Sequence, residues 1–151
     1  MRLSIFSVLF VVLSFSLSGC NLVDSPTDVV GSVYANLMKN DFGAFKAELS
    51  GNALAQYGTP EAAAALQQKL AGKKLHVGSA NLISNTQVDA SSWNRIYSVD
   101  VLETGSDGKN HVLTSAQVLC HVSGTSSGCD IQVCDLQPTT TICSVDEIPS
   151  I

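Results

Sequence analysis

Basic and aromatic residues are scarce in this sequence. The chain of 151 residues has 8 Lys and Arg against 13 Asp and Glu, a formal net charge of −5, and 6% aromatic residues. Nucleic acids and anionic lipid headgroups are bound by surfaces rich in Lys and Arg, so we expect neither as a general partner. No long apolar run follows Leu17, so no later segment is expected to span a bilayer.

The first residues predict a targeting signal. Arg2 is followed by an uncharged apolar stretch from Leu3 to Leu17, and small residues follow that stretch at Ser18 and Gly19. A basic start, an apolar centre of this length and a small-residue exit are typical of a secretory signal peptide. We therefore expect residues 1–19 to be an address for export, removed from the mature protein.

The exit sequence Leu17-Ser18-Gly19-Cys20 resembles the lipobox of bacterial lipoproteins. The resemblance implies that the Cys20 thiol carries a diacylglyceryl group, that cleavage occurs before Cys20, and that its new amino group is acylated. Two or three acyl chains anchor a protein stably, whereas one chain does not. Residues 20–24 would then be a lipidated tether, and Asn21, where inner-membrane lipoproteins have Asp, favours the outer membrane facing the periplasm. The alternative is an ordinary signal peptide followed by an unrelated cysteine.

Four cysteines remain in the last third of the chain. They are Cys120, Cys129, Cys134 and Cys143. An even number of cysteines in an exported domain predicts disulfides, and three pairings are formally possible. Turn residues at Gly124-Thr125 and Pro138-Thr139 lie midway within two hairpins. They favour Cys120–Cys129 and Cys134–Cys143 as directly opposed cross-strand pairs. A zinc site or redox exchange is the competing hypothesis, but no CxxC pair is present, so no metal or cofactor is expected.

Helix-start signals dominate the first half of the domain. In Ser25-Pro26-Thr27-Asp28 the serine can cap, proline suits the first helical position and the aspartate completes a capping box. Asp41 can cap a second helix, which Ser50-Gly51 interrupts. Thr59-Pro60-Glu61 repeats the capping pattern for a third helix that ends at Ala71.

After Lys74 the apolar pattern changes to a period of two, which predicts strands. The expected ranges are 74–88, 94–104, 110–123, 128–136 and 140–148. In the third strand one predicted face holds Val112, Ala116, Val118, Cys120 and Val122, and the other holds His111, Gln117 and His121. One face of the sheet is therefore apolar, and we expect the helices to cover it.

This order of elements resembles the nuclear-transport-factor-like (cystatin-like) superfamily, and small lipoproteins within it. The matching residues are Ser25-Pro26, Val29-Val30, Tyr34, Lys39-Asn40-Asp41-Phe42 and Leu49-Ser50. The resemblance covers about Ser25 to Val122 and implies an α+β fold. In that fold three N-terminal helices pack on a curved antiparallel sheet of four to five strands, within one domain at 25–151. The matching positions are caps and core residues, so no catalytic residue is carried over.

Enzymes of this superfamily enclose a cone between sheet and helices, and the cone holds an Asp or His that acts as acid or base. Such a group needs burial or a charged neighbour to bring its pKa near neutrality. The candidates here are His76, His111, His121 and Asp100, and we expect each at a solvated or edge position. The sequence has no Ser-His-Asp signature, glycine-rich phosphate loop or HExxH motif, so no catalytic residue is predicted.

Aromatic side chains are the candidates for contact with a ligand or partner. Tyr34, Phe45 and Tyr97 can line a pocket or simply fill the core. Trp93 lies in a polar segment and is expected either to cap the core or to contact a partner from the surface. We take Trp93, Tyr97 and Tyr34 as the possible contact residues.

The function predicted from the sequence is that of a lipid-anchored envelope protein acting as a non-catalytic binding or structural module. Besides the membrane, its partner would be a protein, a glycan or a small apolar ligand. The alternatives are a small-molecule enzyme that uses the cone and an envelope inhibitor or immunity protein. A packed cone would disfavour the enzyme, and a deep cone with a buried His or Asp would favour it.

Overall fold

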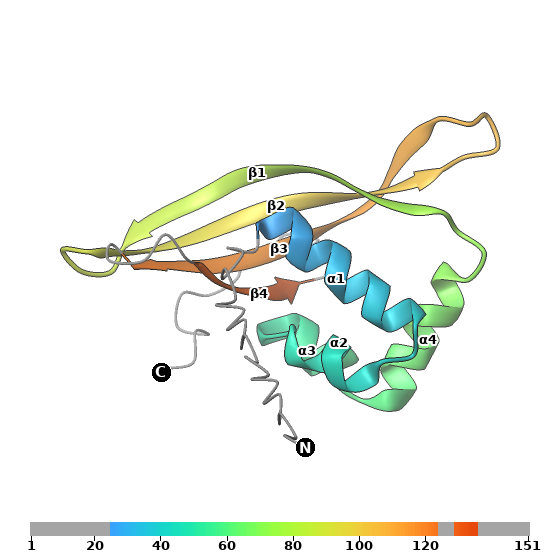
Figure 1. Ribbon diagram of the computed structural model, residues 1–151, viewed down its shortest axis with the longest axis horizontal. Helices are drawn as coiled ribbons and strands as arrows, with labels where there is room; N and C mark the ends of the chain where they lie inside the picture. The colour runs from blue at the N-terminus through green and yellow to red at the C-terminus, as the bar shows by residue number, and fades with distance from the viewer. Residues whose placement is uncertain (1–24, 124–128, 136–151) are drawn as a thin grey trace, which may run out of the picture.

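A computed structural model describes residues 25–123 and 129–135, which form helices followed by an antiparallel sheet (Figure 1). The elements are α1 (Pro26–Met38), α2 (Phe42–Ala47), α3 (Gly51–Tyr57), α4 (Pro60–Leu70), β1 (Leu75–Gln87), β2 (Ser92–Thr104), β3 (Asn110–Ser123) and β4 (Cys129–Asp135). The predicted α+β class is confirmed. The predicted signal, the tether and the strand expected at 140–148 lie outside the described residues.

The first helix begins where its capping residues predict. The Ser25 hydroxyl accepts a hydrogen bond from the Asp28 amide at 3.2 Å, and the Asp28 carboxylate accepts one from the Ser25 amide at 3.2 Å. This reciprocal capping box satisfies amides that the helix itself leaves unpaired. At α4 the Thr59 hydroxyl accepts from the Ala62 amide in the same way. At α2 the Asp41 carboxylate accepts from the Ala44 amide at 3.1 Å. All three predicted helix starts are therefore correct.

The described residues contain four helices, so the expected number of three is wrong. The predicted break at Ser50-Gly51 does not end helical structure but separates α2 from α3. Gly51 has a φ of 50°, in the left-handed region that glycine enters without steric cost. This residue lets the chain change direction and start a new helix at once.

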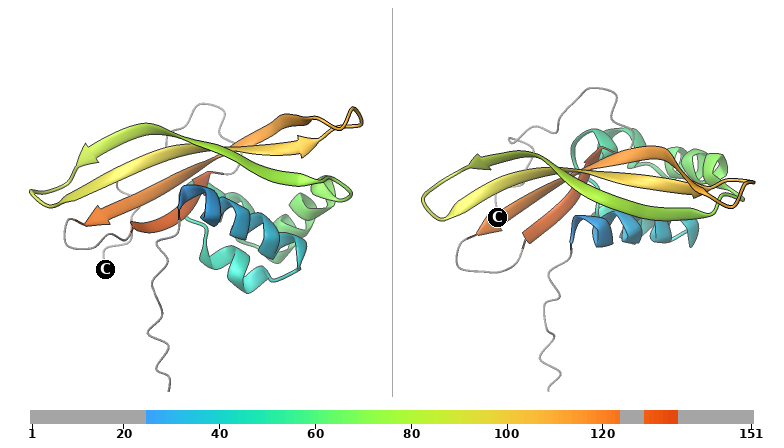
Figure 2. Two further views of the ribbon diagram at one scale, coloured as in Figure 1. Left: turned by 45° about the horizontal axis from the view of Figure 1, so that its top comes forward. Right: turned by 90° about the horizontal axis from the view of Figure 1, so that it is seen from above.

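The four described strands form an antiparallel meander in the order β1-β2-β3-β4, and their bounds lie close to the predicted ranges. Figure 2 shows the helices gathered on one face of the twisted sheet, as expected. Within the described residues, no helix is both long enough and apolar enough to cross a membrane.

A bulge in β3 overturns one predicted strand face. Val101 pairs with Thr114, but the next residue, Leu102, pairs with Val112, so Leu113 is an extra residue. An extra residue reverses which face the following side chains occupy. Val112 is accordingly 64% exposed, while Ala116 and Val118 are completely buried. The prediction that Val112 shares their face is wrong, and His111 likewise does not share the face of His121.

The core fills the space between the helices and the sheet. Its completely buried side chains include Val30, Val33, Phe45, Val99 and Val118. No Asp, Glu, His, Lys or Arg is among the buried residues in the part of the chain that the structure describes. The buried core between helices and sheet therefore consists mainly of Phe45, Tyr34 and aliphatic side chains.

The register of β3 and β4 places the first cysteine pair differently from the prediction. Cys120 lies opposite Ile131, and Cys129 lies opposite Val122. The prediction that Cys120 and Cys129 are directly opposed is therefore wrong, because the register differs by two residues and makes them diagonal positions on neighbouring strands. Cys120 is buried and disulfide-bonded, but the side chains of the other three cysteines lie outside the described part. The two pairings stay predictions.

Candidate functional site

A pocket of about 300 Å³ lies between α1 and the beginning of β1. Its walls are Gly31, Tyr34, Ala35, Met38, Lys73, Leu75, His76, Val77 and Val101. Most of these side chains are apolar, and the polar ones are few. Small-ligand pockets share this composition, and this volume is at the lower end of their range of roughly 300–1,000 Å³.

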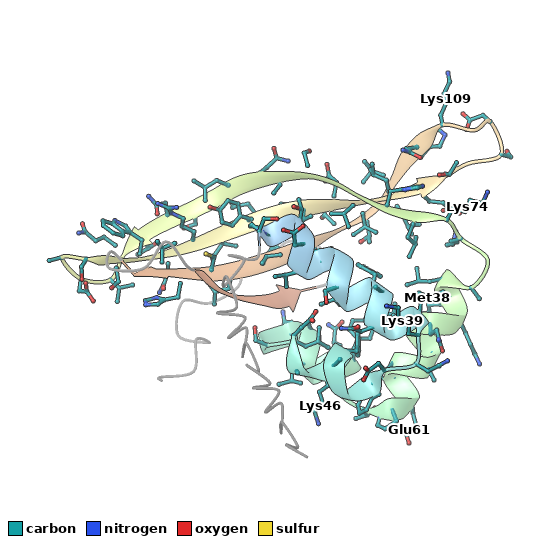
Figure 3. The ribbon with its side chains drawn as sticks, in the orientation of Figure 1. Met38, Lys39, Lys46, Glu61, Lys74 and Lys109 are labelled. Atoms are coloured by element: carbon teal, nitrogen blue, oxygen red, sulfur yellow. The ribbon has the colours of Figure 1, made fainter. Side chains whose placement is uncertain are left out.

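One wall is a stripe along α1. Gly31, Tyr34, Ala35 and Met38 are three or four residues apart, so their side chains lie on the same face of the helix. A Cβ atom placed on Gly31 would lie 3.5 Å from Cγ2 of Val77, so the helix passes close to the strand there. Met38 is 39% exposed and lies at the C-terminal end of α1, where Figure 3 labels it. Because Gly31 and Ala35 are small, they leave room for the pocket, and Met38 lies at its edge.

The opposite wall comes from the sheet. Val77 of β1 pairs with Val101 of β2, and both pack with the helices. Leu75 lies two residues before Val77 and therefore on the same face. The pocket is thus a continuation of the core that opens at the β1 side of the sheet.

Tyr34 is the aromatic residue of the pocket. It is 6% exposed, and burial raises the pKa of its phenol well above the ordinary value, with a smaller contribution from Tyr57. The phenol is therefore neutral near pH 7. It supplies apolar surface together with a hydroxyl that can form a hydrogen bond.

Polar groups lie where the pocket meets the start of β1. The Nζ atom of Lys73 lies 2.8 Å from both carboxylate oxygens of Glu103. The Nε2 atom of His76 is 2.8 Å from the Thr104 hydroxyl, which donates to the side-chain oxygen of Asn110 at 3.0 Å. His76 is exposed, as expected, but it also borders the pocket.

The other candidate acids and bases lie elsewhere. His111 is paired with Asp107 at 3.1 Å in the hairpin between β2 and β3, and His121 contacts the Asn94 side chain at 2.8 Å. The Lys109 amide, and then His111, lower the pKa of Asp107. Asp100 is half-buried on a strand position that alternates with the buried Val99 and Val101. In residues 25–123 and 129–135, no three His, Cys, Asp or Glu side chains form a group that could hold a metal.

Of the three predicted contact residues, only Tyr34 borders the pocket. Tyr97 packs against the core. Trp93 is half-buried and lies opposite Val122. It is four residues from Tyr97 along β2, which separates the two residues by roughly 13 Å. The other pocket residues Gly31, Ala35, Met38 and Lys73 were not predicted as contact residues from the sequence. The one usable signal was the pair Gly31 and Ala35, small residues one helical turn apart beside the core-facing stripe.

Comparisons with known proteins give distant structural likenesses. No family model and no curated protein matches this sequence. The structure of Aln2 from a Streptomyces species is similar at 18% identity and a TM-score of 0.41, covering 76% of this chain and 93% of that one. A ketosteroid isomerase-like protein from Erwinia carotovora atroseptica is similar at 15% identity and a TM-score of 0.29, covering 70% and 85%. These values transfer no activity to the chain, whose class remains α+β.

Proposed function

We propose that this chain is a lipid-anchored protein of the cell envelope whose nuclear-transport-factor-like domain is a non-catalytic binding module. The domain would hold an apolar group of its partner in the pocket between α1 and β1. The observation that carries this proposal is the pocket itself, an apolar space lined by Tyr34, Met38 and Leu75 that opens beside the start of β1.

Two features favour binding over turnover. Among the described residues, no Asp, Glu, His, Lys or Arg is buried between the helices and the sheet, where enzymes of the resembling superfamily hold their acid or base. His111 and His121 have separate hydrogen-bond partners away from the pocket. General acid–base catalysis needs a titratable group within hydrogen-bond reach of the substrate. The titratable side chains at the pocket are Tyr34, which burial keeps protonated, Lys73, which is paired with Glu103, and the exposed His76. These features support the binding module over the alternative of a small-molecule enzyme.

The pocket can be tested by photolabelling the full-length chain with a small alkyl diazirine and mapping the labelled residues. We expect labels on Met38 and Leu75, and we expect Gly31→Leu to remove them by filling the space. Gly43→Leu makes the same change on α2, where the nearest atom to a new Cβ is 3.8 Å away, and should leave the labels in place. Labels that Gly31→Leu does not reduce would overturn the pocket as the binding site. Thermal unfolding of both variants checks that they fold.

The envelope location rests on Cys20 and the preceding apolar segment. Intact-mass analysis of protein extracted from membranes should show acyl chains on Cys20 as the first residue, with residues 20–24 as the tether to an outer membrane facing the periplasm. An unmodified mature N-terminus would overturn the anchor.

The oxidised state of the cysteines follows from export. Non-reducing peptide mapping is expected to join Cys120 to Cys129 and Cys134 to Cys143. A different pairing would correct the connectivity, and four free thiols would contradict the exported location itself.

A further inference from the structure

The pocket lies beside β1, which is the outermost strand on its side of the described sheet. β1 pairs with β2 on one side, and no described strand pairs with it on the other. α1 packs against β1 from the helix-covered face, and Figure 2 shows the helix running beside this outer strand. An edge strand with a helix next to it is the arrangement that an extended peptide can enter by adding one more strand.

The register shows which main-chain groups point to this edge. The Thr104 amide donates to the Lys74 carbonyl at 3.0 Å, so Lys74 and Thr104 form a hydrogen-bonded pair. Hydrogen-bonded and non-hydrogen-bonded pairs alternate in an antiparallel ladder. The main-chain amide and carbonyl of His76 are therefore also directed towards β2, where His76 pairs with Leu102. Leu75 and Val77, opposite Glu103 and Val101, therefore direct their amides and carbonyls away from β2.

The same two residues also line the pocket with their side chains. A strand added at Leu75 and Val77 would place its facing side chains on the same face of the sheet as theirs. That face looks towards Gly31, Ala35 and Met38 of α1. A peptide added beside β1 could therefore form main-chain hydrogen bonds with Leu75 and Val77 and place an apolar side chain in the pocket.

The distribution of charge indicates in which direction an added peptide strand would run. The chain is acidic overall, but Lys39 follows the last residue of α1, and Lys73 and Lys74 precede the first residue of β1. Figure 3 labels Lys39 at the end of α1 and Lys74 at the beginning of β1. An antiparallel peptide would end near the start of β1, so its terminal carboxylate would lie near Lys73, which already binds the Glu103 carboxylate, and near Lys74.

We infer that the partner bound at this site is an extended peptide segment with alternating apolar residues and a free C-terminal carboxylate, which adds to β1 as an antiparallel strand. This inference rests on the proposed binding function and specifies its ligand. Main-chain hydrogen bonds to Leu75 and Val77 supply affinity, and the pocket selects the apolar side chain.

The probe is a synthetic hexapeptide with Val and Leu at alternating positions and a free carboxylate, added to the full-length chain in detergent micelles. Amide hydrogen exchange of individual residues is the measurement. Saturating peptide should slow the Leu75 and Val77 amides about tenfold, because exchange then needs the peptide to dissociate. The His76 amide, already directed towards β2, is the internal control and should not change.

Two chemical variants of the probe separate this inference from the proposed function. A peptide N-methylated at the amides that face β1 keeps its side chains but cannot pair, and it should lose binding. A peptide with an amidated C-terminus should bind several-fold more weakly, and Lys74→Gln should remove that difference while Lys46→Gln on α2 should not.

The outcomes distinguish two kinds of failure. Equal binding of the N-methylated peptide, or unchanged exchange at Leu75 and Val77, would overturn strand addition even if diazirine labelling still locates an apolar site in the pocket. Loss of that labelling site would overturn the proposed function as well.

Discussion

Lys73 and Glu103 join the residues before β1 to the end of β2, with Nζ of Lys73 2.8 Å from both oxygens of the Glu103 carboxylate. Their side chains are 32% and 29% exposed, so solvent screens the pair and its contribution to stability is expected to be at most about 1 kcal/mol. The pair has a larger effect on the charge at the pocket, because the Glu103 carboxylate neutralises the ammonium group of Lys73.

Glu103→Gln should therefore change the melting temperature little and raise the affinity of the carboxylate-ending hexapeptide several-fold. Glu61→Gln, on the exposed first turn of α4, is the matched control and should change neither quantity. Weaker peptide binding by Glu103→Gln would show that the carboxylate does not lie near Lys73.

Among the residues whose burial the structure describes, Phe45 is the largest completely buried side chain, and it comes from the short helix α2. Phe45→Ala should lower the free energy of unfolding by about 3–5 kcal/mol, because it removes buried apolar surface and leaves a cavity. Urea unfolding measures this change. Phe42→Ala, at a partly buried position of the same helix, should cost clearly less, and equal losses would contradict the described core.

The capping box at the start of α1 predicts a second loss of stability. Ser25→Ala removes the acceptor of the Asp28 amide and should lower the free energy of unfolding by about 1 kcal/mol. Ser91→Ala, in the turn between β1 and β2, serves as a control serine outside any helix cap. A loss no larger than that of the control would contradict the cap.

The capping box also has a defined pH dependence. Hydrogen bonds from the Ser25 side chain and then its amide hold the pKa of Asp28 below its ordinary value of 3.8. The stabilisation is therefore fully present above pH 3.8 and is lost as the pH falls through the lower pKa of the folded state. The stability difference between wild type and Asp28→Asn should shrink over that acidic range.

Tyr34 predicts the opposite dependence, at alkaline pH. Burial raises the pKa of its phenol above the ordinary value of 10.0, so above that pH the unfolded chain releases a proton that the folded chain keeps. The folded state therefore loses stability as the pH rises beyond 10. Tyr34→Phe removes this effect, and its unfolding midpoint should fall less than that of wild type between pH 10 and 12.

Local signals predicted much of the fold. The caps at Ser25 and Thr59 act within one helical turn, so the sequence shows them directly. Gly51 was predicted to interrupt a helix, but it is the first residue of α3. A glycine that ends one helix and a glycine that begins the next look the same in the local sequence. The exposed position of Val112 was also missed, since the bulge at Leu113 depends on how two strands pair and not on one strand alone.

The candidate site was only partly predictable for a related reason. Tyr34 is conspicuous as an aromatic residue near the core-facing positions of α1. Gly31 and Lys73 become site residues only when α1 lies across β1, a contact between segments far apart in the sequence. No periodicity within either segment specifies that contact.

The irregularities of β1 limit what can attach to it. The ladder with β2 shifts between Val77 and Ala80 and again between Leu82 and Ser84, so the outer rim of the strand is divided into brief regular stretches. A long regular strand cannot keep a continuous hydrogen-bond register along such an edge, whereas a peptide of a few residues can. A short peptide added at Leu75 and Val77, as inferred above, would therefore be compatible with an edge that resists continuous stacking into fibrils.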